Sequence, residues 1–235
     1  MAEGGRPRSG ARGWRTPLVA GLLGLLVGVA AMLAANGYFV RAYLLENPEI
    51  IPEAMERLRA RENAQAVGAQ RAALETPFHS AWAGAEDGDV VLVEFFDYAC
   101  GYCRAANPDV ERLLAEDPRL KVVWREYPVL GPNSEQAAIA SLAAARAGRF
   151  RLFHERLFAS GRPTPAAIAA ARGAVDVPEP ELTPEIRAEL ERNFALGRAI
   201  GATGTPTFIV GDQVLQGAVG YEALRDAVAE ARERG

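Results

Sequence analysis

A Cys-x-x-Cys motif limits the choice of fold more than any other part of this sequence. The motif, Cys100-Gly101-Tyr102-Cys103, follows shortly after the apolar run Val90–Phe96. The run predicts a strand with both faces covered, and the motif predicts the first turn of a helix. In that turn the backbone N–H groups and the positive end of the helix dipole favour a thiolate over a thiol. The second sulfur lies about one turn further along, within reach of a disulfide bond, so the motif indicates thiol redox chemistry.

The beginning of the chain predicts export. The first fifteen residues carry four arginines and one glutamate, and Pro17–Ala35 is nineteen residues without a charge. About 20 apolar residues cross a bilayer, and positive charge before the span places the N-terminus in the cytoplasm. We therefore expect a cytoplasmic basic tail at 1–16 and a single-pass inner-membrane anchor at 17–40, with the remainder in the periplasm of a bacterial cell. Signal cleavage, which would leave a soluble periplasmic protein, is the alternative, although Leu33 fits a cut after Ala35 poorly.

The motif contains the only two cysteines of the sequence. An exported protein with one such pair has none left for a structural disulfide, which favours a working redox pair. Structural zinc is disfavoured because zinc needs about four ligands, and only His79 and His154 could join the two thiols, at no ligand-like spacing. We expect no metal and no bound cofactor. Handling of copper(I) is the alternative function, since two thiolates suit a soft ion.

Residues 41–77 predict a helical stalk. Asn47-Pro48 has the chemistry of a helix start, and Ile51, Met55 and Leu58 then recur at helical spacing. This apolar stripe needs a cover, which its own domain, the membrane surface or a second copy of the chain would supply. A homo-oligomer formed through the stalk is therefore one expectation. The net charge of −4 favours no nucleic-acid partner.

Residues 78–235 predict a mixed α/β domain. After the strand and the motif helix come a strand at 120–127, a helical region at about 133–200, a hairpin at 207–216 and a helix at 221–234. Breaks in the helical region are expected at Gly148, 161–165 and 178–184. The fold class is therefore α/β, a thioredoxin-like fold with a helical insertion, preceded by a transmembrane helix and the helical stalk.

Glu94 lies inside the apolar strand, six residues before Cys100. Burial of a carboxylate is costly unless the group is paired or used. Strand alternation puts Leu92, Glu94 and Phe96 on one face. We interpret Glu94 as a buried proton acceptor with a raised pKa beneath the motif, which exchanges a proton with the second sulfur. An edge position or a salt bridge with an arginine is the alternative.

Thr205-Pro206 opens the late strand, where proline removes a hydrogen-bond donor and leaves an edge free. We interpret Thr205 and Pro206 as a substrate-binding position, at which a peptide docks as an added strand if the bond is cis. A trans proline that merely starts the strand is the alternative. Gly101 and Tyr102 are expected to tune the cysteine pair, and Tyr102 stabilises a thiolate less than a protonated histidine there would.

Four separated motifs resemble, in their order, those of the DsbA-like family of bacterial thiol–disulfide oxidoreductases. They are Glu94-Phe95-Phe96-Asp97-Tyr98-x-Cys100-x-x-Cys103, Arg125-Glu126-Tyr127-Pro128, Gly131-Pro132-Asn133-Ser134 and Gly201-x-x-Gly204-Thr205-Pro206-Thr207-Phe208. The resemblance covers about residues 78–235 and implies a thioredoxin fold with a cis Pro206. It further implies Cys100 as the attacking thiol, Cys103 as the resolving thiol and Glu94 as the buried acid.

The remaining similarities refine this expectation. Tyr43–Glu49 is similar to the N-terminal helical region of a subgroup linked to copper tolerance, whose members can self-associate there. Gly101-Tyr102 resembles the pair in periplasmic disulfide isomerases, whereas the strongest oxidants carry Pro-His. We therefore expect an exported protein-disulfide oxidoreductase or isomerase that forms or rearranges disulfides in unfolded or misfolded exported proteins. A membrane redox partner is expected to reset it. Oxidase, isomerase and reductase directions stay open.

Overall fold

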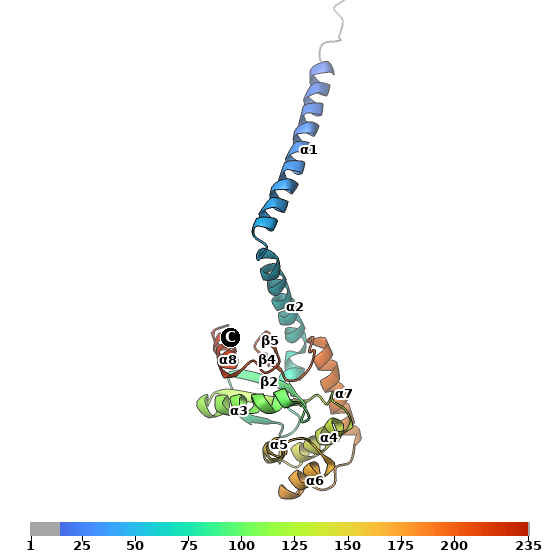
Figure 1. Ribbon diagram of the computed structural model, residues 1–235, viewed down its shortest axis with the longest axis vertical. Coiled ribbons are helices and arrows are strands. Elements are labelled where there is room, and N and C mark those ends of the chain that lie inside the picture. Colours follow the sequence, from blue (N-terminus) through green and yellow to red (C-terminus); the bar gives the residue numbers. More distant parts are fainter. Residues whose placement is uncertain (1–14, 235) are drawn as a thin grey trace, which may run out of the picture. The chain divides into compact units, whose positions relative to one another are not determined.

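The computed structural model describes residues 15–234, and the chain divides into two compact units at residue 57. Figure 1 shows its helices and strands. Helix α1 (Arg15–Glu46) belongs to the first unit, and α2 (Ile50–Glu75) runs across the division. Of the expected basic tail, residues 1–14 lie outside the described residues. Val19–Glu46 is long and apolar enough to cross a membrane, a test that a signal sequence also passes.

The helical stalk differs in one respect from the prediction. The sequence predicts a helix that starts at Asn47-Pro48, whereas α1 continues to Glu46 and α2 begins only at Ile50. The side-chain Nδ2 of Asn47 donates to the carbonyl oxygen of Tyr43 at 2.9 Å, so Asn47 caps the end of α1. Proline disfavours helical backbone at the residue before it, which explains why the chain breaks here.

The second unit contains a mixed five-stranded sheet with the order β1-β3-β2-β4-β5. Strands β2 and β3 are parallel, and the other three pairs are antiparallel. The strands are β1 (Trp82–Gly84), β2 (Val90–Phe96), β3 (Leu120–Glu126), β4 (Thr207–Val210) and β5 (Gln213–Gln216). The sequence predicts all of them except β1, whose three residues are too few to give a periodic pattern.

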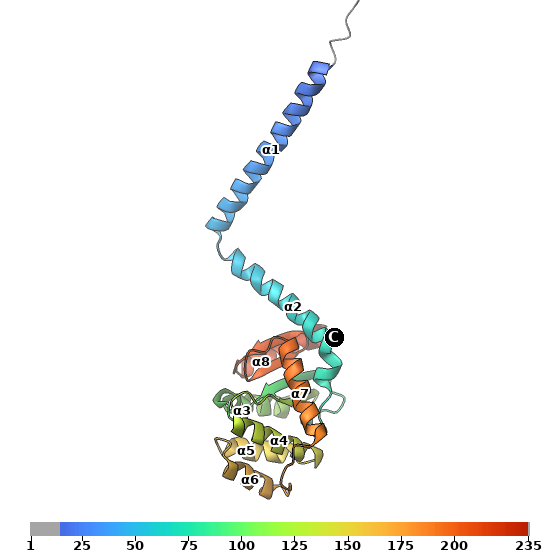
Figure 2. The ribbon, with the colours of Figure 1, turned by 90° about the vertical axis from the view of Figure 1, so that its right-hand side faces the viewer.

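Helices cover both faces of this sheet (Figures 1 and 2). They are α3 (Gly101–Glu116), α4 (Pro132–Arg146), α5 (Phe150–Ala159), α6 (Pro165–Ala174), α7 (Pro184–Ala199) and α8 (Tyr221–Arg234). Helices α4 to α7 form the predicted insertion, broken where the sequence indicates. Thr164 and Thr183 begin α6 and α7 as N-caps, because their side chains accept from the N–H groups of Ala167 and Ile186.

The two faces of the sheet carry two separate hydrophobic clusters. Leu92, Phe96 and Trp124 pack against the helices on one face, together with residues of α3, α4, α5 and α8. Val93 and Phe95 pack on the other face with residues of α2 and α7. Burial on both sides is why β2 and β3 read as continuous apolar runs. The expected thioredoxin-like α/β fold with a helical insertion is confirmed.

Arg125 fastens the C-terminal end of α2 to the sheet. Its side chain is almost fully buried, and its Nε donates to the carbonyl oxygen of Leu74 at 3.0 Å. Nη1 donates to Glu189 Oε1 and Asn193 Oδ1, each at 2.9 Å. Nη2 donates to the carbonyl oxygens of Ala73 and Thr76. The guanidinium therefore satisfies the open carbonyls at the end of α2, which a helix end cannot satisfy by itself.

Candidate active site

The two thiols lie where the sequence predicts, at the start of α3. Cys100 is the N-cap residue, with extended backbone, and Cys103 lies in the first turn. Both are free; Cys100 is 6% exposed and Cys103 is fully buried. The backbone N–H of Cys100 donates to the carbonyl oxygen of Asp97 at 3.0 Å, which closes the turn between β2 and the helix. The N-cap position lies next to the N–H groups of the first helical turn, which have no partner within the helix.

The Thr205–Pro206 segment lies against the outer thiol. Its peptide bond is cis, as the resemblance implies. The Sγ of Cys100 donates to the carbonyl oxygen of Thr205 at 3.2 Å, although 105 residues separate the two in sequence. The structure thus brings Cys100, Cys103, Thr205 and Pro206 together, while their roles in catalysis and substrate binding stay predictions.

Glu94 lies buried in β2, only 2% exposed. Its Oε2 accepts a hydrogen bond from the indole Nε1 of Trp124 at 3.0 Å, and the two residues are register partners on β2 and β3. Burial raises the pKa of Glu94 to about 8, and the charge of Glu111 acts in the same direction. Burial also raises the pKa of the Cys103 thiol far above its usual range, and the charge of Glu94 raises it further. The acid and the inner thiol are therefore electrostatically coupled.

Asp97 joins the thiol turn to the loop after β3, a link that the sequence analysis missed. Its Oδ1 accepts from the backbone N–H of Ala99 at 2.8 Å. Its Oδ2 accepts from the N–H groups of Val129 and Leu130, at 2.9 and 3.0 Å. An aspartate at the end of a strand is a turn signal, so the contact with Ala99 could have been predicted from the sequence. The contacts with Val129 and Leu130 come from a distant segment and were not.

The family comparison agrees with this geometry. The family described as "DSBA-like thioredoxin domain" matches residues 91–229, more than half of the chain. The chain belongs to the DSBA-like thioredoxin domain family. A second family, described as "Copper resistance protein ScsC N-terminal domain", matches residues 37–65. The DsbA-like resemblance and its ScsC-like subgroup are confirmed.

Three similar proteins place this DSBA-like chain among its relatives. A linker-deletion mutant of ScsC from Proteus mirabilis has a TM-score of 0.73 and 31% identity, covering 88% of this chain and 97% of that one. "Disulfide bond formation protein D" from Bacillus subtilis is 24% identical, covering 62% of this chain and 73% of that protein. "Na(+)/H(+) antiporter NhaA 3" from Salinispora tropica is 32% identical over 63% of this chain. The chain spans about a quarter (24%) of that antiporter.

A buried polar network of this DSBA-like domain was also missed. The hydroxyl of Tyr98 lies 2.9 Å from Ser141 Oγ and 3.1 Å from Nδ1 of His154. The other ring nitrogen of His154, Nε2, lies 3.1 Å from Asn107 Oδ1. Burial lowers the pKa of His154 well below its usual range, so the ring is neutral. His154 is thus a buried packing residue, and its ring joins α3 to α5.

A second buried acid, Glu126, ends β3 beside Glu94. It is 2% exposed, and its Oε1 has no hydrogen-bond partner within the described residues. Burial raises its pKa well above the usual range, and the charges of Asp97 and Glu94 add to that shift. Glu126 belongs to a motif that the sequence resemblance includes, but nothing in its immediate sequence distinguishes it from an exposed glutamate at a strand end.

Three exposed apolar side chains belong to the thiol motif and to the loop that Asp97 binds. Tyr102 is 71% exposed between the cysteines, and Val129 and Leu130 are 44% and 55% exposed in the loop bound by Asp97. Gly101 is exposed as well. An apolar surface of this kind favours contact with apolar segments of another polypeptide.

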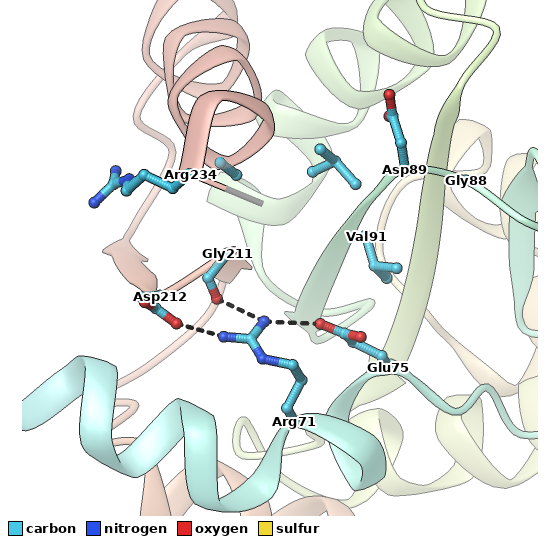
Figure 3. A pocket seen from close by; sticks show the side chains of 10 residues that line it. Arg71, Glu75, Gly88, Asp89, Val91, Gly211, Asp212 and Arg234 are labelled. Atoms are coloured by element: carbon cyan, nitrogen blue, oxygen red, sulfur yellow. Dashed lines mark hydrogen bonds and ion pairs between the residues drawn. The ribbon is translucent and has the colours of Figure 1, made fainter.

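A separate cavity lies at the opposite end of β2 from the thiols (Figure 3). It has a volume of about 350 Å³ and is lined by α2, the start of β2, the β4–β5 turn and α8. Arg71 bonds there with Glu75, the Gly211 carbonyl and Asp212. The arginine is thereby engaged within the domain, which indicates that it ties α2 to the β4–β5 turn.

Proposed function

We propose that the chain is an exported thiol–disulfide oxidoreductase that forms or rearranges disulfide bonds in unfolded or misfolded proteins outside the cytoplasm. The observation that carries the proposal is the Cys100–Cys103 pair at the start of α3, set against Thr205 and above the buried Glu94. The apolar surface formed by Tyr102, Val129 and Leu130 suits clients that still expose apolar segments.

The proposed cycle begins with the oxidised pair. A client thiolate attacks Cys100 Sγ, the bond between Cys100 and Cys103 breaks, and Cys103 leaves as a thiolate. Glu94 gives its proton to that thiolate, because the pKa of Cys103 lies above that of Glu94. A second client thiolate then attacks the client sulfur of the mixed disulfide and releases Cys100 as a thiolate. The client loses two electrons and the pair gains them. A membrane redox partner removes them again.

Isomerisation uses the same two cysteines but starts from the reduced pair. The Cys100 thiolate attacks a client disulfide, and a different client thiolate later displaces it, with no net electron transfer. Cys103 resolves the mixed disulfide when no client thiolate does so. The Gly101-Tyr102 pair places no positive charge beside Cys100 at neutral pH, which supports an oxidising position below the extreme of the superfamily.

The proposed location is the outer face of the inner membrane. In this proposal α1 is the single-pass anchor, and the soluble form that follows signal cleavage is the alternative. The apolar segment Val19–Glu46 supports both. Extraction of the native protein separates them, since the anchor requires detergent for release whereas the cleaved form leaves with the soluble periplasmic fraction.

The test is disulfide turnover by the purified chain. Reduction of insulin and recovery of activity from a scrambled disulfide protein are measured for the wild type, Cys100→Ser and Cys103→Ser. We expect Cys100→Ser to abolish both activities and Cys103→Ser to accumulate a mixed disulfide with the client. Ala105→Ser, at an exposed position of α3, is the matched control and should keep full turnover. Turnover by Cys100→Ser would exclude the proposed mechanism.

Copper(I) handling is the second candidate function. The match of residues 37–65 to the copper resistance protein ScsC N-terminal domain favours it, and Cys100 and Cys103 would supply the two soft ligands. A competition titration with copper(I), made on the same samples as the insulin assay, separates the two functions. Stoichiometric uptake without turnover would support the copper function.

A further inference from the structure

The surroundings of Glu94 contain an ion pair that the proposed cycle leaves unused. On β3, Trp124 donates to Glu94, and a second acid, Glu126, lies two residues further along. Helix α3 contributes Cys103 and Glu111, and α5 contributes Arg151 and His154. Asp97, at the end of β2, holds three backbone N–H groups. The remaining titratable groups are Tyr98, whose hydroxyl lies 3.1 Å from Nδ1 of His154, and Glu155, which pairs with Arg151 at 3.1 Å.

Burial shifts the pKa of three of these neighbours toward their uncharged forms. It raises the pKa of Cys103 far above its usual range and raises the pKa of Glu126 well above its usual range, so burial favours the protonated form of both. Burial lowers the pKa of His154, so its ring carries no charge. The side chains of Glu111 and Arg151 are 31% and 29% exposed and form an ion pair, and Arg151 also pairs with Glu155 at 3.1 Å.

Trp124 connects that ion pair to the acid. The guanidinium of Arg151 lies 5.0 Å from the centroid of the Trp124 ring, within the range of a cation–π contact. The same guanidinium donates to both carboxylate oxygens of Glu111, from Nη1 to Oε1 at 2.8 Å and from Nη2 to Oε2 at 2.7 Å. The indole N–H of Trp124 donates to Glu94. One tryptophan therefore contacts the acid with its N–H and the arginine with its ring.

We propose that Glu111 and Arg151 are positioning residues that set how readily Glu94 releases its proton, a tuning role that rests on the proposed oxidoreductase function. The negative charge of Glu111 disfavours ionisation of Glu94, and the positive charge of Arg151 opposes that effect. Arg151 comes from the helical insertion, whereas Glu94 belongs to the thioredoxin-like sheet. The insertion thus controls the acid of the neighbouring sheet.

Removal of the two charges should move the pH at which Glu94 ionises in opposite directions, which makes the proposal testable. Loss of the negative charge in Glu111→Gln leaves Arg151 near the acid, so Glu94 should ionise at lower pH. Loss of the positive charge in Arg151→Gln leaves Glu111 unopposed, so Glu94 should ionise at higher pH. Each change should move the midpoint by about half a pH unit, the size expected of one partly screened charge.

The experiment follows the carboxyl group directly. The oxidised full chain, in detergent and labelled with ¹³C at glutamate Cδ, is titrated by NMR from about pH 5 to 10, with the Glu94 signal assigned by its absence in Glu94→Gln. Arg151→Lys, which keeps the charge, should shift the midpoint less than Arg151→Gln. Arg112→Gln is the matched control, because Arg112 pairs with Glu116 on the same helix and lies over the ring of Tyr221. It should leave the midpoint unchanged.

Shifts in the same direction in Glu111→Gln and Arg151→Gln would overturn the proposal, because loosened packing that admits water lowers the midpoint in both. An unchanged midpoint in both would overturn it as well. The titration does not depend on turnover, so an inactive wild type would exclude the proposed function while the opposite shifts still supported the tuning. If Arg151→Gln failed to fold, Glu111→Gln and Arg151→Lys would decide the question.

Discussion

Glu94 and Cys103 illustrate how burial sets the chemistry of single residues in this protein. The pKa of Glu94 is raised to about 8, and that of Cys103 is raised much further. A thiolate formed on Cys103 is therefore a stronger base than the Glu94 carboxylate. In the proposed cycle this order would let Glu94 give its proton to the inner sulfur as that sulfur leaves the disulfide.

Replacement of Glu94 by Gln should remove this assistance and keep a side chain of the same shape against Trp124. Reduction of the disulfide by a small thiol is followed by tryptophan fluorescence in stopped flow and corrected for the thiolate fraction of the reagent. The wild-type rate should fall as pH rises through about 8, because Glu94 then loses its proton. Glu94→Gln should be about 100-fold slower at pH 7 and lack this inflection. Equal pH profiles would contradict the role of the acid.

The same variant should change stability. The pKa of Glu94 is raised from 4.5 to about 8 in the folded protein. Between these values the folded state binds more protons than the unfolded state, so the free energy of unfolding decreases as pH rises. Glu94→Gln should therefore be more stable than the wild type at pH 7, by up to about 3 kcal/mol, and the gain should vanish near pH 4.5. Urea unfolding at the two pH values measures it.

Among the elements, those with local signals were predictable. An apolar run gave β2, and threonine caps placed the starts of α6 and α7. The cysteine pair and Glu94 were found because each is unusual within its own few residues. β1, Asp97, Glu126 and the Glu111–Arg151 pair were missed because their significance depends on partners that are distant in the sequence. Asn47 was predicted to begin α2, whereas its side chain caps the end of α1. The sequence does not distinguish the two because an asparagine between two helices can cap either one.

Buried Arg125 holds the C-terminal end of α2 against the sheet. Arg125→Met should lower the free energy of unfolding by about 3–5 kcal/mol, because it leaves Glu189 as a buried charge without its main partner. Arg192→Gln removes an exposed partner of the same Glu189 and should cost less than about 1 kcal/mol. Urea unfolding of both variants tests the difference. If both variants lost the same free energy of unfolding, the buried pair of Arg125 and Glu189 would contribute no more to stability than the exposed pair.

For the molecule as a whole, self-association through the stalk is the open question. Ile51, Met55 and Leu58 are about half exposed on α2, and the ScsC N-terminal family matches this segment. Static light scattering of the full chain in detergent should give an oligomer, and Met55→Glu combined with Leu58→Glu should give a monomer. Arg61→Glu, an exposed change on the same helix, should leave the mass unchanged. A monomeric wild type would count against isomerisation, which benefits from several thiol pairs around one client.

The unequal burial of the two sulfurs affects how long the protein would stay in a mixed disulfide with a client polypeptide. Cys100 is 6% exposed and Cys103 is fully buried, so a bulky polypeptide reaches only the outer sulfur. Every covalent adduct therefore forms with the inner sulfur still free and adjacent. In the proposed cycle, that sulfur would attack Cys100 Sγ and release a stalled polypeptide without help from any other molecule. Burial of Cys103 beside Cys100 would thus limit how long a wrong partner stays attached.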